Sequence, residues 1–190
     1  MRSINVRPLA YEWNDLMDLV RPAIHREQVR ALLGSPTFAN SHRWRYRYRE
    51  TQVEICFTEN DSVDAVVMIL LEGNKYYGSH PTGHTDRPLG DLTLEDVLDG
   101  EGSIESIRYF ESGRTREVFI CERWGPTGAW NYYACGAFIV LSGVGDLAEV
   151  SFEWDRDLAR LKSDPKDVRI NWMASMSSFA NDPPGFDWFI

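Results

Sequence analysis

Two histidines and an aspartate lie close together in the segment His80-Pro-Thr-Gly-His84-Thr-Asp86. Neutral imidazoles and a carboxylate are side chains with which proteins hold Zn²⁺ or a similar ion. Pro81 and Gly83 predict a loop here, so no helical spacing orients the ligands in advance. We therefore expect neither a metal nor another cofactor. The segment does support an alternative hypothesis, an enzyme of unrecognised type that uses a His/Asp loop.

Four arginines alternate with aromatic residues between positions 43 and 49. A period of two predicts a strand with one cationic face and one aromatic face. A row of guanidinium groups can bind phosphate or carboxylate bidentately. The possible anion-binding residues, which the enzyme hypothesis would use as an Arg-lined phosphate site, are Arg43, Arg45, Arg47 and Arg49. The simpler interpretation is cross-strand pairing with acids such as Glu54 on a charged outer face.

The sequence offers little for nucleophilic catalysis. Its three cysteines, Cys56, Cys121 and Cys135, fit neither a disulfide framework nor a zinc pattern, so we expect reduced thiols. Arg47 could lower the pKa of Cys56, and Cys121 could be reactive, but strand cysteines are more often inert. A phosphate-binding loop of the Walker type, a nucleophile elbow and a His-Glu-x-x-His helix are all missing from the chain. These observations favour a binding protein.

Hydrophobic periodicity predicts several short helices that would position these residues. Residues 11–20 and 25–33 have apolar side chains at helical spacing, and Gly34 is suited to end the second helix. Residues 92–98 predict a further short helix, and residues 155–163 a short polar one.

The arginine-rich strand continues into a predicted hairpin. A tight turn at Thr51-Gln52 would place Tyr48 opposite Ile55 on one face and Arg49 opposite Glu54 on the other. Residues 63–70 predict a third, more buried strand.

The same order of elements recurs later in the chain. Cys135-Gly136 predicts a hairpin turn, and a spacing of 84 residues then relates Tyr46 to Trp130 and Ile55 to Ile139. A spacing of 68 relates Glu27 to Glu95, so the second copy would carry extra strand-like residues between its helix and its hairpin. Chance similarity between hairpins is the other interpretation.

These elements predict an α+β fold in which short helices pack on antiparallel sheet, in two tandem helix-plus-hairpin modules. The first module would span residues 1–75, and a linker rich in Gly and Pro would span residues 76–90. The second would span residues 91–190, with a strand insert and an apolar C-terminal tail.

The first half resembles the BamE/SmpA-like module. The resemblance rests on Val29-Arg-Ala-Leu-Leu-Gly-Ser-Pro36, on Trp44-Arg-Tyr46 and on Val53-Glu-Ile-Cys-Phe57. Two such modules in tandem are similar to the β-lactamase inhibitory protein architecture. The resemblance implies a scaffold that grips a partner protein with an aromatic-rich sheet face, and it implies no catalytic residues.

Composition limits the classes of function. The 190 residues carry a net charge of −9, which disfavours nucleic acid as a partner because phosphates attract Lys and Arg. The sequence contains no apolar run long enough to cross a membrane and no secretory signal, so we expect a cytoplasmic protein.

A non-enzymatic protein-binding inhibitor is therefore the predicted function, most specifically an immunity protein that neutralises a toxin or effector. Aromatic side chains anchor protein interfaces, and an acidic surface speeds the capture of a basic partner. The predicted contact residues are Tyr76, Tyr77, Trp124, Trp130 and Tyr133, together with Asp96, Asp99 and Glu101.

Overall fold

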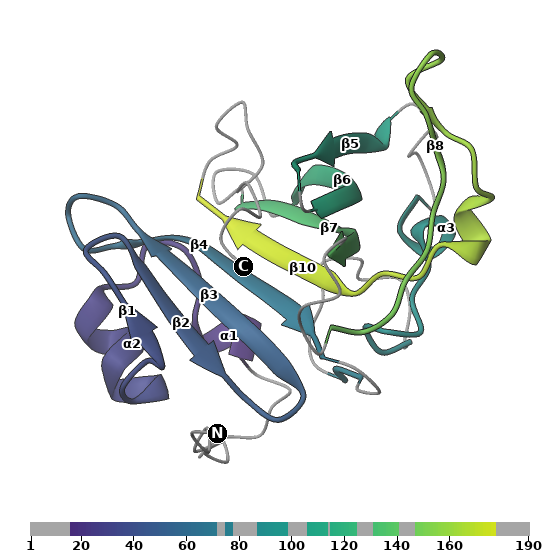
Figure 1. The fold of residues 1–190 in the computed structure, drawn as a ribbon. Coiled ribbons are helices and arrows are strands. Elements are labelled where there is room, and N and C mark those ends of the chain that lie inside the picture. Colours follow the sequence, from purple (N-terminus) through teal and green to yellow (C-terminus); the bar gives the residue numbers. More distant parts are fainter. Residues whose placement is uncertain are drawn as a thin grey trace.

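An eight-stranded antiparallel sheet is the main element of the computed structural model (Figure 1). The structure describes residues 16–71, 75–77, 87–98, 106–113, 115–124, 131–140 and 147–177. The strand order is β1-β2-β3-β4-β10-β7-β6-β5. The strands are β1 (Phe38–Ala39), β2 (Arg43–Arg47), β3 (Thr51–Phe57), β4 (Val63–Leu70), β5 (Arg108–Glu111), β6 (Thr115–Trp124), β7 (Asn131–Val140) and β10 (Trp172–Met176).

The predicted α+β class is wrong, because the fold is mainly β. In the part of the chain that the structure describes, α2 (Arg26–Leu33) is the longest helix, with eight residues. The helices α1 (Leu16–Leu19) and α3 (Leu94–Leu98) have four and five residues, and η3 (Pro165–Asp167) is a single 3-10 turn. Elements this short cannot form a helical layer over eight strands.

The predicted polar helix at residues 155–163 is a hairpin instead. Its two short strands are β8 (Trp154–Asp155) and β9 (Arg160–Leu161). An Asp155 side-chain oxygen accepts hydrogen bonds from the backbone N–H groups of Asp157 and Leu158. Such a turn satisfies the backbone locally and competes with the helix that periodicity suggests.

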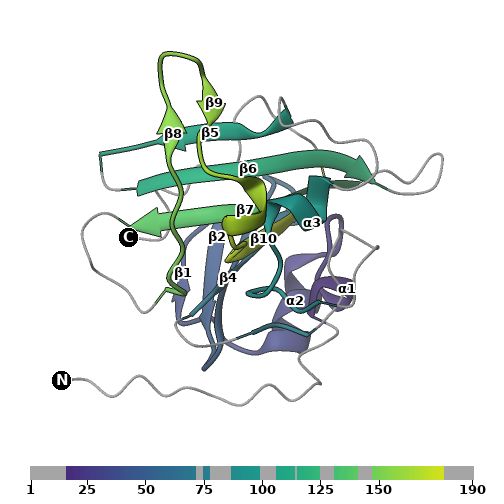
Figure 2. The ribbon, with the colours of Figure 1, turned by 90° about the vertical axis from the view of Figure 1, so that its right-hand side faces the viewer.

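The helices and one face of the sheet share an apolar core. Val20 of the first helical segment, Val29 of α2 and Leu94 of α3 belong to the same buried cluster as Ile55 and Met173 of the sheet. The opposite face carries a second buried cluster with large aromatic side chains near β6, β7 and β10, which includes Phe119, Phe138 and Trp172. Figure 2 shows the strong twist between the two halves of the sheet.

Each half of the sheet is preceded in the chain by a helix with a capping box, in which two residues of the first turn each accept a hydrogen bond from a backbone N–H of that turn. At α2, the His25 ring accepts a hydrogen bond from the Glu27 N–H, and the Gln28 side chain accepts one from the His25 N–H. At α3, the Thr93 hydroxyl accepts from the Asp96 N–H, and the Asp96 carboxylate accepts from the Thr93 N–H. Each cap satisfies backbone donors that a helix start leaves without partners.

Corresponding backbone bonds tie these helix starts to the two central strands. The Val63 N–H donates to the Ile24 carbonyl, and the Ile170 N–H donates to the Leu92 carbonyl, both at 2.8 Å. The strands that follow, β4 and β10, pair with each other with Val67 opposite Ala174. Two four-stranded meanders, β1-β2-β3-β4 and β5-β6-β7-β10, therefore join through their last strands.

The β2–β3 hairpin keeps the predicted faces but not the predicted register. Arg45, rather than Arg49, lies opposite Glu54, and Trp44 lies opposite Ile55. The Tyr48 N–H donates to the Thr51 carbonyl at 2.9 Å, so the turn begins earlier than predicted. Because the shift is an even number of residues, the aromatic side chains still face the core.

The predicted turn at Cys135-Gly136 is wrong, and so is the correspondence based on a spacing of 84 residues. Both residues lie inside the continuous strand β7, where Gly136 is opposite Phe119 of β6 and Trp172 of β10. A side chain at Gly136 would collide with the Val118 carbonyl oxygen, 2.0 Å from an ideal Cβ. Glycine is needed here for close strand approach.

The ends of the predicted linker, residues 76–90, meet in the structure. Tyr76 and Leu89 form an antiparallel bridge through hydrogen bonds of 3.1 and 2.9 Å, and both side chains are fully buried. Tyr76 therefore belongs to the core, because its ring lies in the same apolar cluster as the helices.

Asn171 is a buried polar side chain that joins three segments, and replacing it with leucine is expected to lower the free energy of unfolding by about 3 to 5 kcal/mol. Its amide donates to the carbonyls of Phe138 (2.9 Å) and Ala148 (3.0 Å), and its oxygen accepts from the Phe138 N–H (2.8 Å). Leucine would leave these buried backbone groups without partners. Urea unfolding measures the change, and Asn60→Leu at an exposed turn should stay within about 0.5 kcal/mol of wild type. Equal stabilities for the two variants would contradict this role.

Candidate partner-binding surface

The residues predicted to contact a partner have different environments. Tyr77 is 68% exposed, whereas its neighbour Tyr76 is fully buried and so cannot contact a partner in this structure. Asp96 caps α3 and forms an ion pair with Arg87 at 3.0 Å. Tyr133 is half-buried on β7. Asp96 and Tyr133 therefore come from different elements, α3 and β7.

Several predicted residues lie outside the described ranges. They are Asp99, Glu101 and Trp130, and the possible metal ligands His80, His84 and Asp86. For Trp124 the structure gives only the backbone position, at the end of β6.

The arginine row of β2 lies against a buried carboxylate. Glu54 is fully buried, and its oxygens lie 2.5 Å from Nε of Arg45 and 3.8 Å from Nε of Arg43. Burial raises the pKa of Glu54, and the positive charges of Arg45 and Arg43 oppose that rise. Arg47 donates to the Gln52 side chain at 3.4 Å. Cross-strand pairing with Glu54 is therefore found for Arg43 and Arg45, whereas the predicted hairpin placed Arg49 opposite Glu54.

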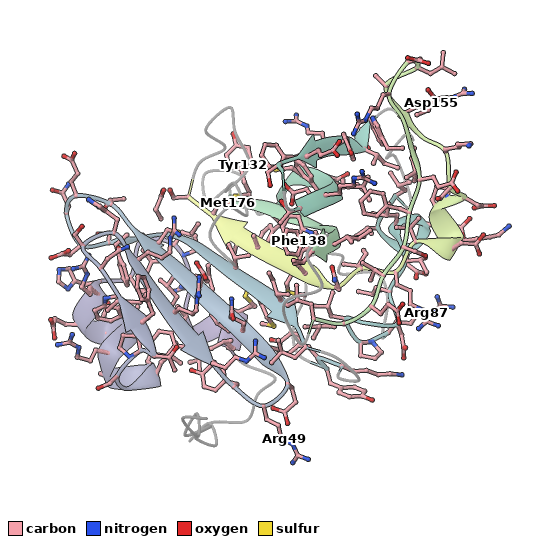
Figure 3. All side chains as sticks on the ribbon, viewed as in Figure 1. Arg49, Arg87, Tyr132, Phe138, Asp155 and Met176 are labelled. Carbon is pink, nitrogen blue, oxygen red and sulfur yellow. The ribbon has the colours of Figure 1, made fainter. Side chains whose placement is uncertain are left out.

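Arg49 does not take part in this arrangement. Its side chain is 87% exposed, and it extends from the end of the β2–β3 hairpin (Figure 3). Of the four arginines predicted to form a row, three lie on β2 and the fourth, Arg49, lies in the turn that follows it.

A groove of about 650 Å³ opens beside β2, at the edge of the sheet where β1 is short. Phe38 of β1 lines it and is 49% exposed. The guanidinium of Arg45 lies 5.8 Å from the centre of the Phe38 ring, which is close enough for a cation–π contact. The residues lining the groove are Leu33, Ser35, Pro36, Thr37, Phe38, Arg45, Tyr46, Arg47, Tyr48 and Gln52.

Two stacked tyrosines give the groove a rigid aromatic part. The rings of Tyr46 and Tyr48 are 6.3 Å apart and nearly parallel. The Tyr46 hydroxyl donates to the Gly34 carbonyl at 3.2 Å, which ties β2 to the end of α2. Burial raises the pKa of both phenols, that of Tyr48 to about 12, so they stay neutral at physiological pH.

The groove can therefore bind an amphipathic segment. Arg45, Arg47 and Gln52 offer donors to a carboxylate, and Phe38 offers a ring to an apolar side chain. Phe38 was not among the residues predicted to contact a partner, although its position just before the arginine row was a usable signal.

A second exposed apolar residue lies on the β8–β9 hairpin, which projects from the body of the molecule (Figure 2). Leu158 at its turn is 59% exposed. The base of the hairpin is anchored, because the Trp154 ring stacks on Tyr109 at 4.9 Å and Arg156 pairs with Glu111. The hairpin thus has an anchored base and an exposed leucine at its turn.

The cysteines are expected to react slowly with thiol reagents in the native protein at pH 8. Burial raises the pKa of Cys56 to about 12, of Cys121 to about 11 and of Cys135 to about 12, and the thiolate is the reactive form. The guanidinium beside Cys56 is that of Arg43, not Arg47, and it does not reverse the effect of burial. A colorimetric thiol assay should detect all three thiols only after unfolding. Fast reaction of the native protein would contradict this prediction.

Within the described ranges, no group of three or more His, Cys, Asp or Glu side chains is placed to hold a metal ion. No helix in that part of the chain has the length and apolar character needed to span a membrane.

Comparisons with known proteins assign the chain to no family. No family model matches it, and no curated protein matches it. Among solved structures, it is similar to YjgB, a DUF4309 family protein from Bacillus subtilis. The TM-score is 0.42 and the sequence identity 12%, over 85% of this chain and 84% of that one.

Proposed function

We propose that this protein is a non-enzymatic, cytoplasmic inhibitor that binds a protein partner, of the immunity type that neutralises a toxin or effector. The observation that carries the proposal is the groove beside β2, where the half-exposed ring of Phe38 lies next to the guanidinium of Arg45. Arginine and large aromatic residues contribute most of the energy at protein interfaces.

Pre-organisation supports this role. Glu54 fixes the Arg45 side chain in the free protein, so little rotamer freedom would be lost when a partner carboxylate binds. The stacked tyrosines are equally restrained. A partner segment that places an acidic side chain against Arg45 and Arg47 and an apolar one against Phe38 would satisfy the whole groove.

The net charge of −9 supports a protein partner rather than nucleic acid. An acidic protein attracts a basic partner over distance and so captures it faster. The groove would then supply the short-range contacts, because attraction over distance and local recognition depend on different charges.

The alternative, an enzyme with an Arg-lined phosphate site, has less support. Among the described residues, the lining of the groove beside Arg45 and Arg47 includes no Asp, Glu, His, Cys or Lys side chain, so it offers none of the usual general bases for an enzyme. The version that uses His80, His84 and Asp86 depends on residues outside the described ranges.

The test is co-expression with the product of the gene adjacent to the one encoding this chain. That product should arrest growth alone, and this protein should restore growth and bind it in a purified titration. A Phe38→Ala, Arg47→Ala double variant should weaken binding at least about tenfold, as expected for loss of a hot spot.

Leu158→Ala is the matched control, because it removes an exposed apolar side chain at another site. It should leave binding unchanged. A harmless neighbour, or binding that depends on Leu158 and not on Phe38, would overturn the proposal.

A further inference from the structure

The segments before and after the β8–β9 hairpin, residues 148–153 and 162–171, are joined by hydrogen bonds at both ends. Next to the hairpin they are joined by the Lys162 N–H, which donates to the Glu153 carbonyl at 2.9 Å. At the other end they are joined by the Asn171 side chain, which donates to the Ala148 carbonyl at 3.0 Å. Between these junctions lies a slot of about 590 Å³. Its lining includes residues 148–151 from the first segment and Asp167 and residues 169–171 from the second, together with Lys75, Gly90 and Asp91.

The first side of the slot is an extended segment that pairs with no strand in the described part of the chain. Its side chains alternate as in a strand: Val150 and Phe152 pack on the apolar core, whereas Glu149 and Ser151 are exposed. Among the described residues, no backbone hydrogen bond involves the N–H or carbonyl groups of residues 149–152. An extended edge of this kind is a template for strand pairing.

The second side also offers backbone groups. The Val168 carbonyl accepts from the Leu94 N–H, and the Ile170 N–H donates to the Leu92 carbonyl. Arg169 lies between them, opposite Thr93 in an antiparallel bridge, so its own N–H and carbonyl point away from Thr93. Neither group makes a backbone hydrogen bond within the described part of the chain.

Charges around the slot favour a basic ligand. Glu149 and Asp167, one on each side, are exposed and take part in no ion pair with a described residue. Asp91 is neutralised by Lys75 at 2.5 Å. The exposed Arg169 offsets one of the two remaining acids, so the rim is weakly negative.

We propose that this slot binds an extended, Lys- or Arg-containing peptide segment of a partner protein, which adds to the edge at residues 149–152 as a β-strand. Backbone hydrogen bonds would supply affinity, and the carboxylates of Glu149 and Asp167 would select basic side chains. This site is separate from the groove beside β2 and does not depend on the proposed inhibitor function.

Amide hydrogen exchange of the full chain tests the free edge. The amides of Val150, Ser151 and Arg169 should exchange rapidly, whereas those in the middle of β4 should be strongly protected. Protection of the three edge amides in the free chain would show that they are already bonded, and it would overturn the proposal.

A peptide titration tests recognition. The probe is an acetylated and amidated octapeptide of alternating lysine and valine. Because only every second N–H of an extended segment faces a given neighbour, its binding should slow exchange at one alternating set of amides, either Glu149 and Ser151 or Val150 and Phe152. Two control peptides, one with glutamate in place of lysine and one with N-methylated valines, should bind at least about tenfold more weakly because they lack the charge or the donors. Equal binding of all three peptides, or no binding of the lysine peptide, would refute strand addition.

Charge-reversal variants locate the site. Glu149→Lys combined with Asp167→Lys should weaken binding of the lysine peptide about tenfold, and the effect should shrink at high salt. Glu59→Lys, at an exposed turn of the first half, is the matched control and should leave binding unchanged. A larger loss in the control than in the double variant would place the peptide elsewhere.

Discussion

Replacing Gly136 with alanine is expected to lower the free energy of unfolding by about 3 kcal/mol or more. An ideal Cβ at this position would lie 2.0 Å from the Val118 carbonyl oxygen and 2.7 Å from the Phe119 Cα. Both are backbone atoms of β6, so the collision cannot be relieved by rotating a side chain. Relief requires β6 and β7 to move apart in the middle of the sheet, where their ladder is ten residue pairs long.

Thermal and urea unfolding measure this effect, with Gly113→Ala as the matched control. An ideal Cβ at Gly113 meets no atom within 4 Å, so alanine there should leave stability unchanged or raise it by up to about 1 kcal/mol. For a chain of this size, the loss at Gly136 should lower the Tm by roughly 6 to 12 °C. Similar Tm values for the two variants would show that the strands do not approach as closely as described.

Replacing Glu117 with glutamine is expected to remove a large pH dependence of stability. Glu117 is 1% exposed on β6, where it lies opposite Phe110 and Phe138, and its oxygens have no hydrogen-bond partner among the described residues. Burial without a cation raises its pKa to about 9, so the carboxyl is protonated in the native protein at neutral pH. The ordinary glutamate pKa of about 4.5 applies to the unfolded chain.

The direction of the pH effect follows from proton binding. Between the two pKa values the native state holds a proton that the unfolded state releases. The stabilising effect of this proton is fully present below about pH 4.5 and is lost as the pH rises toward 9. The free energy of unfolding should therefore fall by about 1.4 kcal/mol for each pH unit in this interval.

Urea unfolding of wild type and Glu117→Gln at pH 5, 6, 7 and 8 isolates this group. The difference between the two proteins should grow in favour of the variant by about 3 to 4 kcal/mol from pH 5 to pH 8. The control is Glu59→Gln, at an exposed turn, whose free energy of unfolding should change with pH in the same way as that of wild type. If the free energy of unfolding of Glu117→Gln instead changes with pH as that of wild type does, the Glu117 carboxyl is ionised in the native protein and its charge is stabilised by a partner.

Two buried glutamates of the sheet, Glu54 and Glu117, show how neighbouring charges affect the pKa of a buried carboxyl group. Glu54 lies against the guanidiniums of Arg45 and Arg43, which offset part of the cost of its burial. Glu117 is equally buried, but no charged group contributes to the shift of its pKa. Sequence position alone does not separate these cases, because both glutamates lie inside a strand next to at least one apolar residue.

Local sequence was sufficient to determine three elements of the first half, α2, β2 and β4. The extent of α2 and its end at Gly34 follow from apolar spacing and a glycine suited to a left-handed backbone, with φ of 76°. The two faces of β2 follow from strict alternation, and β4 has the predicted bounds of residues 63 and 70. These features depend on interactions between residues that are close in the chain.

Tertiary structure decided the register of β2 and β3, the role of Gly136, the burial of Tyr76 and the pairing of β4 with β10. The last three depend on residues that are distant in sequence, such as Val118 for Gly136 and Leu89 for Tyr76. Alternating polar and apolar residues assign each side chain to a face of the sheet. The same assignment results for all pairing registers that differ by an even number of residues, so alternation does not fix the register. Which strand lies alongside, and how near its backbone comes, is determined only when the whole sheet is assembled.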